Sequence, residues 1–161
     1  MTVLLLESFP DSADADRAAA VVMRMCRAAQ APTHGAASAR WHLGVDRPAV
    51  RHYAGDPVVG VVDWNFWGLL FGVAFRLPLA AAARGSAGGL GPQVLGDIGI
   101  ADQFLNRLRD DVVPGRSGLL VLAPNTSREP IAEALRPLSG RPHWLDLVGS
   151  DARALWETFV A

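Results

Sequence analysis

The sequence predicts an α+β protein with a ferredoxin-like βαββαβ core, an inserted apolar helical hairpin over residues 63–99 and a C-terminal αβα extension. Three observations lead to this prediction. Residues 3–6 and 118–123 are wholly apolar runs of strand length, typical of strands covered on both faces. Segments with helical spacing of apolar residues lie between the predicted strands. Residues 63–99 are too rich in Gly, Ala and large apolar residues for a surface connection. At 161 residues, the chain 1–161 fits a single domain.

The first half of the chain predicts a strand, a helix and a β-hairpin. After strand 3–6, Ser12 can cap a helix of about four turns whose apolar stripe includes Cys26. Residues 31–37 are typical of a Pro/Gly loop. Alternation then predicts paired strands at 40–45 and 50–54, with Trp41 and His52 on the inner face. Four polar or aromatic residues are expected to face outward: Arg40, His42, Arg51 and Tyr53.

The second half predicts a helix at 102–112, a strand at 118–123, a further helix, a strand at 143–148 and a terminal helix. Thr126 and Glu129 have the spacing of a capping box, and Ser150 can cap the last helix. Ser139 and Gly140 end the helix that precedes the last strand. In this α+β plan the helices are expected on one face of the sheet.

The segment 63–99 predicts two short helices folded back on each other. Pro78 cannot continue a helix, so the apolar run divides into arms at 64–75 and 79–95. Glycines in both arms are expected to form the contact between the arms, and aromatic residues of the first arm are expected to contact other chains. Gly68 and Gly72 in the first arm, and Gly85 and Gly89 in the second, recur four apart, and such glycine faces allow close backbone approach. Trp64, Trp67, Phe71 and Phe75 project from the first arm and are expected to pack chain on chain.

Composition excludes several classes of function. All 15 basic residues are Arg, so lysine-dependent phosphate loops, Schiff-base enzymes and lysine general bases are excluded. The net charge is −1, whereas a protein that binds nucleic acid needs a positively charged surface, so nucleic acid is not expected as a partner. A lone cysteine and the absence of a signal-peptide pattern favour a cytoplasmic location. A mean hydropathy of +0.20 indicates apolar surface that self-association, lipid or a partner would cover.

No pattern predicts a catalytic residue, a metal site or a cofactor. His52 has no second ligand at metal-binding spacing and is expected to be a hydrogen-bonded core histidine. Cys26 is expected to be a buried, inert thiol. The glycines at 85–91 lack the third glycine of the dinucleotide fingerprint, because Val94 stands at its position. The chain is therefore predicted not to be an enzyme.

The segment 64–121 resembles a bacterial family of domains of unknown function whose members are often labelled predicted membrane proteins. The resemblance rests on the Trp67-Gly68-Leu69-Leu70 and Phe71-Gly72 motifs, Pro78-Leu79, the glycines at 85–91, Asp97-Ile98-Gly99-Ile100, Phe104 and Pro114-Gly115-x-Ser117. It implies a glycine-zipper hairpin and brings no activity, cofactor or catalytic residue.

Two classes of function remain. The first is a self-associating protein whose hairpin mediates homo-oligomer assembly, with a membrane surface as a further contact of the hairpin. The second is a carrier module that holds a lipid-like molecule, such as a quinone, between assembled hairpins. The aromatic residues of the first arm serve either function.

Overall fold

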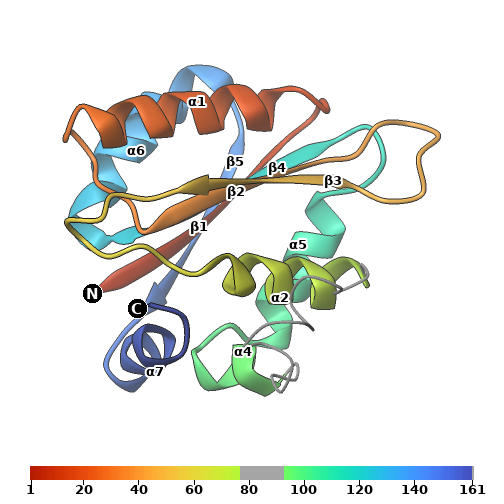
Figure 1. The fold of residues 1–161 in the computed structure, drawn as a ribbon. Coiled ribbons are helices and arrows are strands. Elements are labelled where there is room, and N and C mark those ends of the chain that lie inside the picture. The colour runs from red at the N-terminus through yellow and green to blue at the C-terminus, as the bar shows by residue number, and fades with distance from the viewer. Residues whose placement is uncertain (77–92, 161) are drawn as a thin grey trace.

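The computed structural model describes residues 1–76 and 93–160 and has an α+β architecture (Figure 1). A five-stranded antiparallel sheet in the order β3-β2-β4-β1-β5 forms its middle layer. The strands are β1 (Thr2–Phe9), β2 (Gly35–Arg40), β3 (Ala49–Ala54), β4 (Ser117–Pro124) and β5 (Arg141–Leu147). In the described part, the helices are α1 (Asp14–Arg27), α2 (Trp64–Phe75), α4 (Gln93–Asp97), α5 (Asp102–Asp111), α6 (Arg128–Leu135) and α7 (Ser150–Phe159). Short 3-10 turns at Asn125–Ser127 and Arg136–Leu138 flank α6.

Strands β1 and β4 lie at the centre of the sheet. Every residue of β1 is buried, and Leu5 pairs with Val121 of β4 on one side and Trp144 of β5 on the other. Because successive side chains point to opposite faces of a strand, Leu4 and Leu6 enter one core cluster and Leu5 enters the other. The prediction of strands covered on both faces is confirmed.

Helices α1 and α6 cover one face of the sheet (Figure 1). The predicted Ser12 cap is not formed, because Ala13 is the N-cap residue of α1 and makes no side-chain cap hydrogen bond. Asp11 precedes it, and its Oδ1 accepts hydrogen bonds from the backbone N–H groups of Ala13 at 2.7 Å and Asp14 at 2.9 Å. The capping box predicted at Thr126 and Glu129 is not formed, since α6 begins directly after a 3-10 turn without a side-chain cap.

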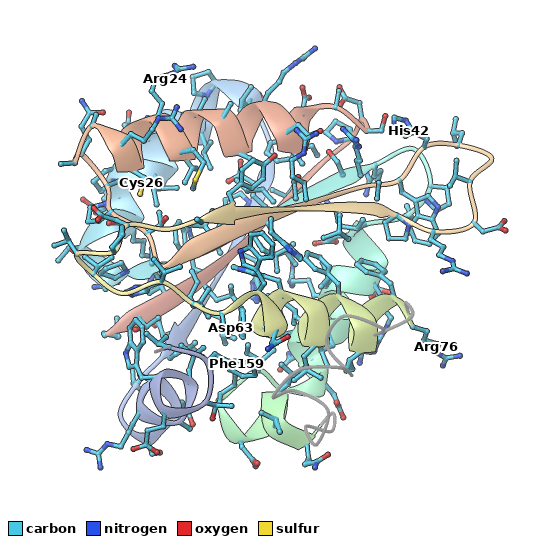
Figure 2. The ribbon with its side chains drawn as sticks, in the orientation of Figure 1. Arg24, Cys26, His42, Asp63, Arg76 and Phe159 are labelled. Carbon is cyan, nitrogen blue, oxygen red and sulfur yellow. The ribbon has the colours of Figure 1, made fainter. Side chains whose placement is uncertain are left out.

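Helices α2, α4, α5 and α7 cover the other face, which corrects the expectation of helices on one face only (Figure 1). Their core cluster holds large side chains, among them Phe66 and Trp67 of α2 and Leu155 of α7. The chain end returns to the start of α2: the backbone N–H of Asp63 donates to the carbonyl of Phe159 at 2.7 Å (Figure 2). This contact fixes the N-terminus of α2 against α7.

The first half of strand β2, residues 35–37, lies where the sequence predicts a loop. Residues 41–45, predicted as a strand, form a connection that is exposed at 42–45. The β2 sequence Gly-Ala-Ala-Ser-Ala-Arg has no aromatic or β-branched residue, which is why periodicity missed it. Its alanines are buried between helices on the two faces, where small side chains let the layers approach. Leu43 and Val45 are exposed.

The order of the strands also differs from the predicted plan. In a ferredoxin-like arrangement of the first four strands, the third strand would lie between the first and the second. Here β4 takes that inner position, and within residues 1–76 and 93–160 β3 pairs only with β2. Strand β3 therefore lies at the edge of the sheet.

Candidate functional site

Helix α2 is the first arm of the predicted hairpin, and its bounds, Trp64–Phe75, are confirmed. Asp63 caps it, because its Oδ1 accepts a hydrogen bond from the backbone N–H of Asn65 at 2.7 Å. Arg76 ends it in the left-handed conformation, with φ of 54°. Asp63 and Arg76 mark the two ends of the helix in Figure 2, on the opposite side of the sheet from Arg24 and Cys26 of α1.

The aromatic residues of α2 do not form one external surface. Trp67 and Phe71 are 1% and 2% exposed and lie in the core of their own chain. Phe75 is partly buried and stacks on Phe71 at a centroid distance of 6.1 Å. The expectation that all four aromatic residues pack chain on chain is therefore wrong for Trp67 and Phe71, because the sheet of the same chain covers them.

Trp64 is the exception, with 65% of its surface exposed. It is the first residue of α2, where the helix reaches the edge strand β3. Its ring centroid lies 6.0 Å from that of His52 of β3. Among the described residues, Trp64 is the one aromatic side chain in the set of exposed large apolar residues.

The structure describes two of the four glycines that the sequence predicts between the hairpin arms. Gly72 is buried in α2, and Gly68 is half-buried. Gly85, Gly89 and most of the second arm lie outside the described residues, whereas α4 forms the end of that segment. The contact between the glycine faces remains a prediction.

Strand β3 presents two different faces. Val50 packs against the core beneath α2, and His52 shares that face. Tyr53 packs against the opposite core, beside α1. Arg51 is exposed and makes no ion pair or hydrogen bond in the described part of the chain. The predicted alternation along this strand is confirmed.

A polar cluster ties this side of the sheet to α1. Asp16 accepts hydrogen bonds from Ser38 Oγ at 2.7 Å and from the Arg40 guanidinium at 2.7 Å. The hydroxyl of Tyr53 lies 3.5 Å from the same carboxylate. Arg40 and Tyr53, both expected to face outward, therefore also contact α1, although the Arg40 side chain stays 37% exposed.

Burial shifts the pKa values of one carboxyl group and three histidines. Burial raises the pKa of Glu7, in the central strand, from 4.5 to about 7. Burial lowers the pKa of His34 and of His52, and it lowers that of His143 together with the nearby charge of Arg107. In the described residues no three His, Cys, Asp or Glu side chains gather to hold a metal ion.

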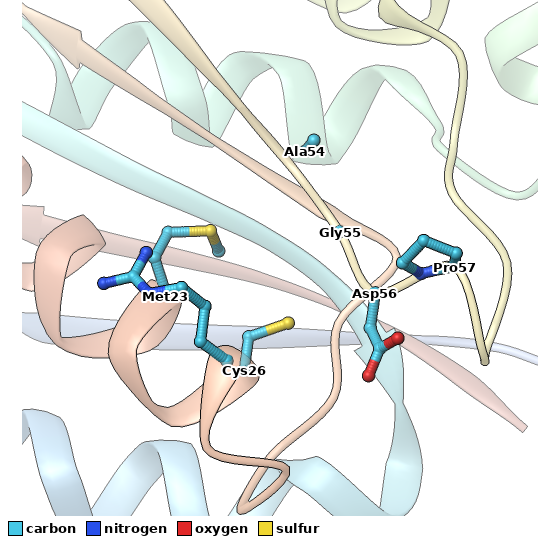
Figure 3. Close-up of a pocket in the computed structure, with 7 residues that line it drawn as sticks. Met23, Cys26, Ala54, Gly55, Asp56 and Pro57 are labelled. Carbon is cyan, nitrogen blue, oxygen red and sulfur yellow. The ribbon is translucent and has the colours of Figure 1, made fainter.

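Cys26 lines a pocket of about 330 Å³ at the C-terminal end of α1 (Figure 3). Met23 lies beside it, and residues 54–57 form the opposite wall. Cys26 is buried, as predicted, and its sulfur accepts a hydrogen bond from Thr33 Oγ1 at 3.6 Å. Gly55 holds this wall close, because a Cβ there would lie 2.4 Å from the backbone of Thr33 and His34. Arg27 and Asp56 line the same pocket.

A second pocket of about 330 Å³ lies between α2, α4 and the start of α5. Val73, Ile100 and Leu105 supply most of its apolar wall, while Gln93 and Asp102 are polar residues of its lining.

None of the helices in the described part is at once long and apolar enough to cross a bilayer.

Comparison with known proteins places the chain in a family. No curated protein and no solved structure matches the chain. The sequence model described as "Protein of unknown function (DUF1269)" matches residues 62–159, which is more than half of the 161 residues. The match begins at the segment that caps α2 and runs through α7. On this match the chain belongs to the DUF1269 family of proteins of unknown function.

Proposed function

We propose that this protein is a non-enzymatic, self-associating protein and that the N-terminal end of α2 takes part in its assembly. The exposure of Trp64 carries the proposal. A large aromatic side chain at the end of an otherwise buried apolar helix gains free energy when a partner covers it. Tryptophan is also enriched among the residues that dominate protein interfaces.

The surroundings of Trp64 support its role in assembly rather than in folding. The capping contacts of Asp63 hold the start of α2 in place without the indole. His52 lies beside the indole on an exposed edge strand, so the two elements form a continuous accessible surface. A partner that contacts Trp64 therefore also reaches β3.

Light scattering and sedimentation of the full chain in detergent-free buffer test the proposal. We expect an oligomer, and we expect Trp64→Glu to shift it toward the monomer while the circular dichroism spectrum stays unchanged. Val148→Glu is the matched control, because Val148 is also exposed, at 51%, but follows β5 at the other edge of the sheet. A wild-type protein that is monomeric at every concentration contradicts the proposal.

A carrier function is a second candidate. The sequence places its ligand between assembled hairpins, whereas the apolar pocket that favours it here lies within one chain, between α2, α4 and α5. A volume of about 330 Å³ is at the lower end of the range that holds a small ligand. Organic extraction of the purified protein followed by mass spectrometry tests this function. A stoichiometric lipid or quinone supports it, and an empty extract counts against it.

Membrane contact is a further part of the assembly proposal. Trp64 at one end of α2 and Arg76 at the other are residue types that anchor proteins at membrane interfaces. Flotation with liposomes tests this contact, with Trp64→Glu as the comparison. If neither protein floats, association is confined to protein surfaces.

We further propose that β1, β2, β4 and β5, with α1 and α6, form a ferredoxin-like fold. In this assignment β4 and β5 are its third and fourth strands, in place of the strands 50–54 and 118–123 predicted from the sequence. The units β1-α1-β2 and β4-α6-β5 interleave in the order β2-β4-β1-β5, which supports this arrangement. Strand β3 and the segment from α2 to α5 then form an insertion between β2 and β4. An experimental structure with a different strand order would contradict it.

A further inference from the structure

Strand β3 is an edge strand without the usual protection against pairing. It contains no Pro or Gly and carries one charged side chain, Arg51. In the described part of the chain its backbone bonds to β2 and to no other element. Natural edges are normally blocked by Pro, several charges or a covering element, so an open edge of six residues is a template for another strand.

The faces of β3 restrict how a second copy could pair with it. In an antiparallel pair around a two-fold axis, residues directly opposite each other point to the same face. One register places Arg51 opposite Arg51 of the second copy, which sets like charges against each other. Moving the axis by one residue places His52 opposite itself, Arg51 opposite Tyr53, and Val50 opposite Ala54. That register pairs a guanidinium with an aromatic ring and two small apolar residues with each other.

We propose that a second copy of this chain adds to the sheet through β3, antiparallel, with His52 on the two-fold axis. The two five-stranded sheets then form one continuous sheet. This inference rests on the proposed function, because it names the surface through which self-association takes place.

The same arrangement covers the exposed indole. Trp64 lies 6.0 Å from His52, ring centre to ring centre, on the α2 face of the sheet. With His52 on the axis, the two copies of Trp64 flank the axis on one face. The dimer thus buries an unpaired strand edge and two exposed indoles in one contact.

Charge substitutions at His52 test the register, because a residue on a two-fold axis faces its own copy. We expect His52→Asp and His52→Lys each to weaken the dimer by at least about tenfold, since each places like charges opposite one another. An equimolar mixture of the two variants is expected to restore dimers, because the carboxylate of one variant then faces the ammonium group of the other. Sedimentation velocity measures all three samples, and circular dichroism checks their folding.

The outcomes separate this inference from the proposed function. If both variants remain as dimeric as the wild type, or if the mixture stays monomeric, β3 pairing around His52 is wrong. If Trp64→Glu dissociates the oligomer in that case, the proposed function stands and only the inference fails. A wild-type monomer contradicts both.

Cross-linking gives a second measurement that does not depend on charge. In a Cys26→Ser background, His52→Cys should form an intermolecular disulfide on mild oxidation, because directly opposite Cβ atoms lie about 4.5 to 5.5 Å apart. Arg51→Cys is the control, since its copies would be diagonal neighbours about 7 to 8 Å apart. Equal cross-linking at the two positions would overturn the register.

Discussion

Strands β5 and β3 form the two edges of the same sheet, but their surroundings differ. β5 carries Pro142 and pairs with the fully buried strand β1. Arg128 of α6 lies over its Trp144, 5.2 Å from the ring centre, and pairs with Asp146 at 3.1 Å. β3 contains no proline, makes no ion pair with any residue that the structure describes, and pairs with β2, a strand of small residues.

This difference suggests a division of roles between the edges. Side chains near β5 make their contacts within the chain, so changes there should alter the free energy of unfolding. On β3, Val50 and Tyr53 pack against the two cores, but Arg51 is exposed and has few contacts to lose, so a change at Arg51 should alter association instead. The predictions below test this division, from the largest expected effect to the smallest.

Glu7 of β1, beside β5, should give the largest effect. Its pKa is about 7 in the folded protein and 4.5 ordinarily, so the folded state binds the proton more tightly than the unfolded state. The contribution of the protonated Glu7 carboxyl to the free energy of unfolding is fully present below pH 4.5. It is lost as the pH rises from 4.5 to 7, and the total loss is up to about 3 kcal/mol. We expect Glu7→Gln to remove this loss. Urea unfolding at pH 5 and pH 8 measures it.

The difference between the two proteins isolates Glu7 from the histidines. The pKa values of His34 and His52 are lowered by burial, so they reduce stability as the pH falls, which is the opposite direction. These histidines are present in both proteins and cancel in the comparison. An equal pH dependence for wild type and Glu7→Gln would show that the Glu7 carboxyl is not destabilised by burial.

Gly140, directly before β5, should give the next largest effect. A Cβ at this position would lie 2.6 Å from the ring of Phe9 and from a carboxylate oxygen of Glu7. Phe9 is fully buried and cannot move aside, so we expect Gly140→Ala to cost about 1 to 3 kcal/mol in urea unfolding. Gly96→Ala is the control, because a Cβ there meets nothing within 4 Å and helix propensity favours alanine. Equal effects of both would contradict the close approach.

Arg128 should give a smaller effect on the same edge. Its side chain and that of its partner Asp146 are 39% and 52% exposed, and such pairs contribute about 0 to 1 kcal/mol. The contact with Trp144 adds a cation–π interaction of similar size. We expect Arg128→Ala to cost about 1 kcal/mol, and Arg136→Ala, whose ion pair is more exposed, to cost less. A larger loss for Arg136→Ala would show that the β5 contact adds nothing.

The sequence predicts the central elements well, because their burial leaves a direct signature. The apolar runs of β1 and β4 and the arm 64–75 are found as predicted. β2 was missed because its small residues resemble a loop, and the sheet imposes the extended form on them. The sequence predicts that Ser139 and Gly140 end the preceding helix and gives no sign of a second role for Gly140. Ser139 adopts the left-handed conformation instead, and Gly140 serves the close approach to Phe9.

The candidate site was predicted only in part, because it depends on strand order. Local periodicity placed His52 and Arg51 on opposite faces of a strand, which is confirmed. It could not show that β4 would enter between β1 and β2 and leave β3 at the edge. Helical spacing also could not separate Trp64 from Trp67. The two residues differ in exposure because Trp67 lies under the sheet, whereas Trp64 lies at the end of the helix.

Arg51 on the open edge should have the smallest effect on stability and a measurable effect on association. It is exposed and has no ion pair within the described chain, so Arg51→Ala should change the free energy of unfolding by less than about 0.5 kcal/mol. In the dimer each Arg51 would face Tyr53 of the second copy, and losing two exposed cation–π contacts of about 0.5 to 1 kcal/mol each should weaken dimerisation roughly five- to thirtyfold. Unfolding at a concentration well below the dissociation constant, together with sedimentation equilibrium, measures the two quantities separately. If Arg51→Ala lowers the free energy of unfolding by more than about 1 kcal/mol and leaves the dissociation constant of the dimer unchanged, the roles assigned to the two edges are reversed.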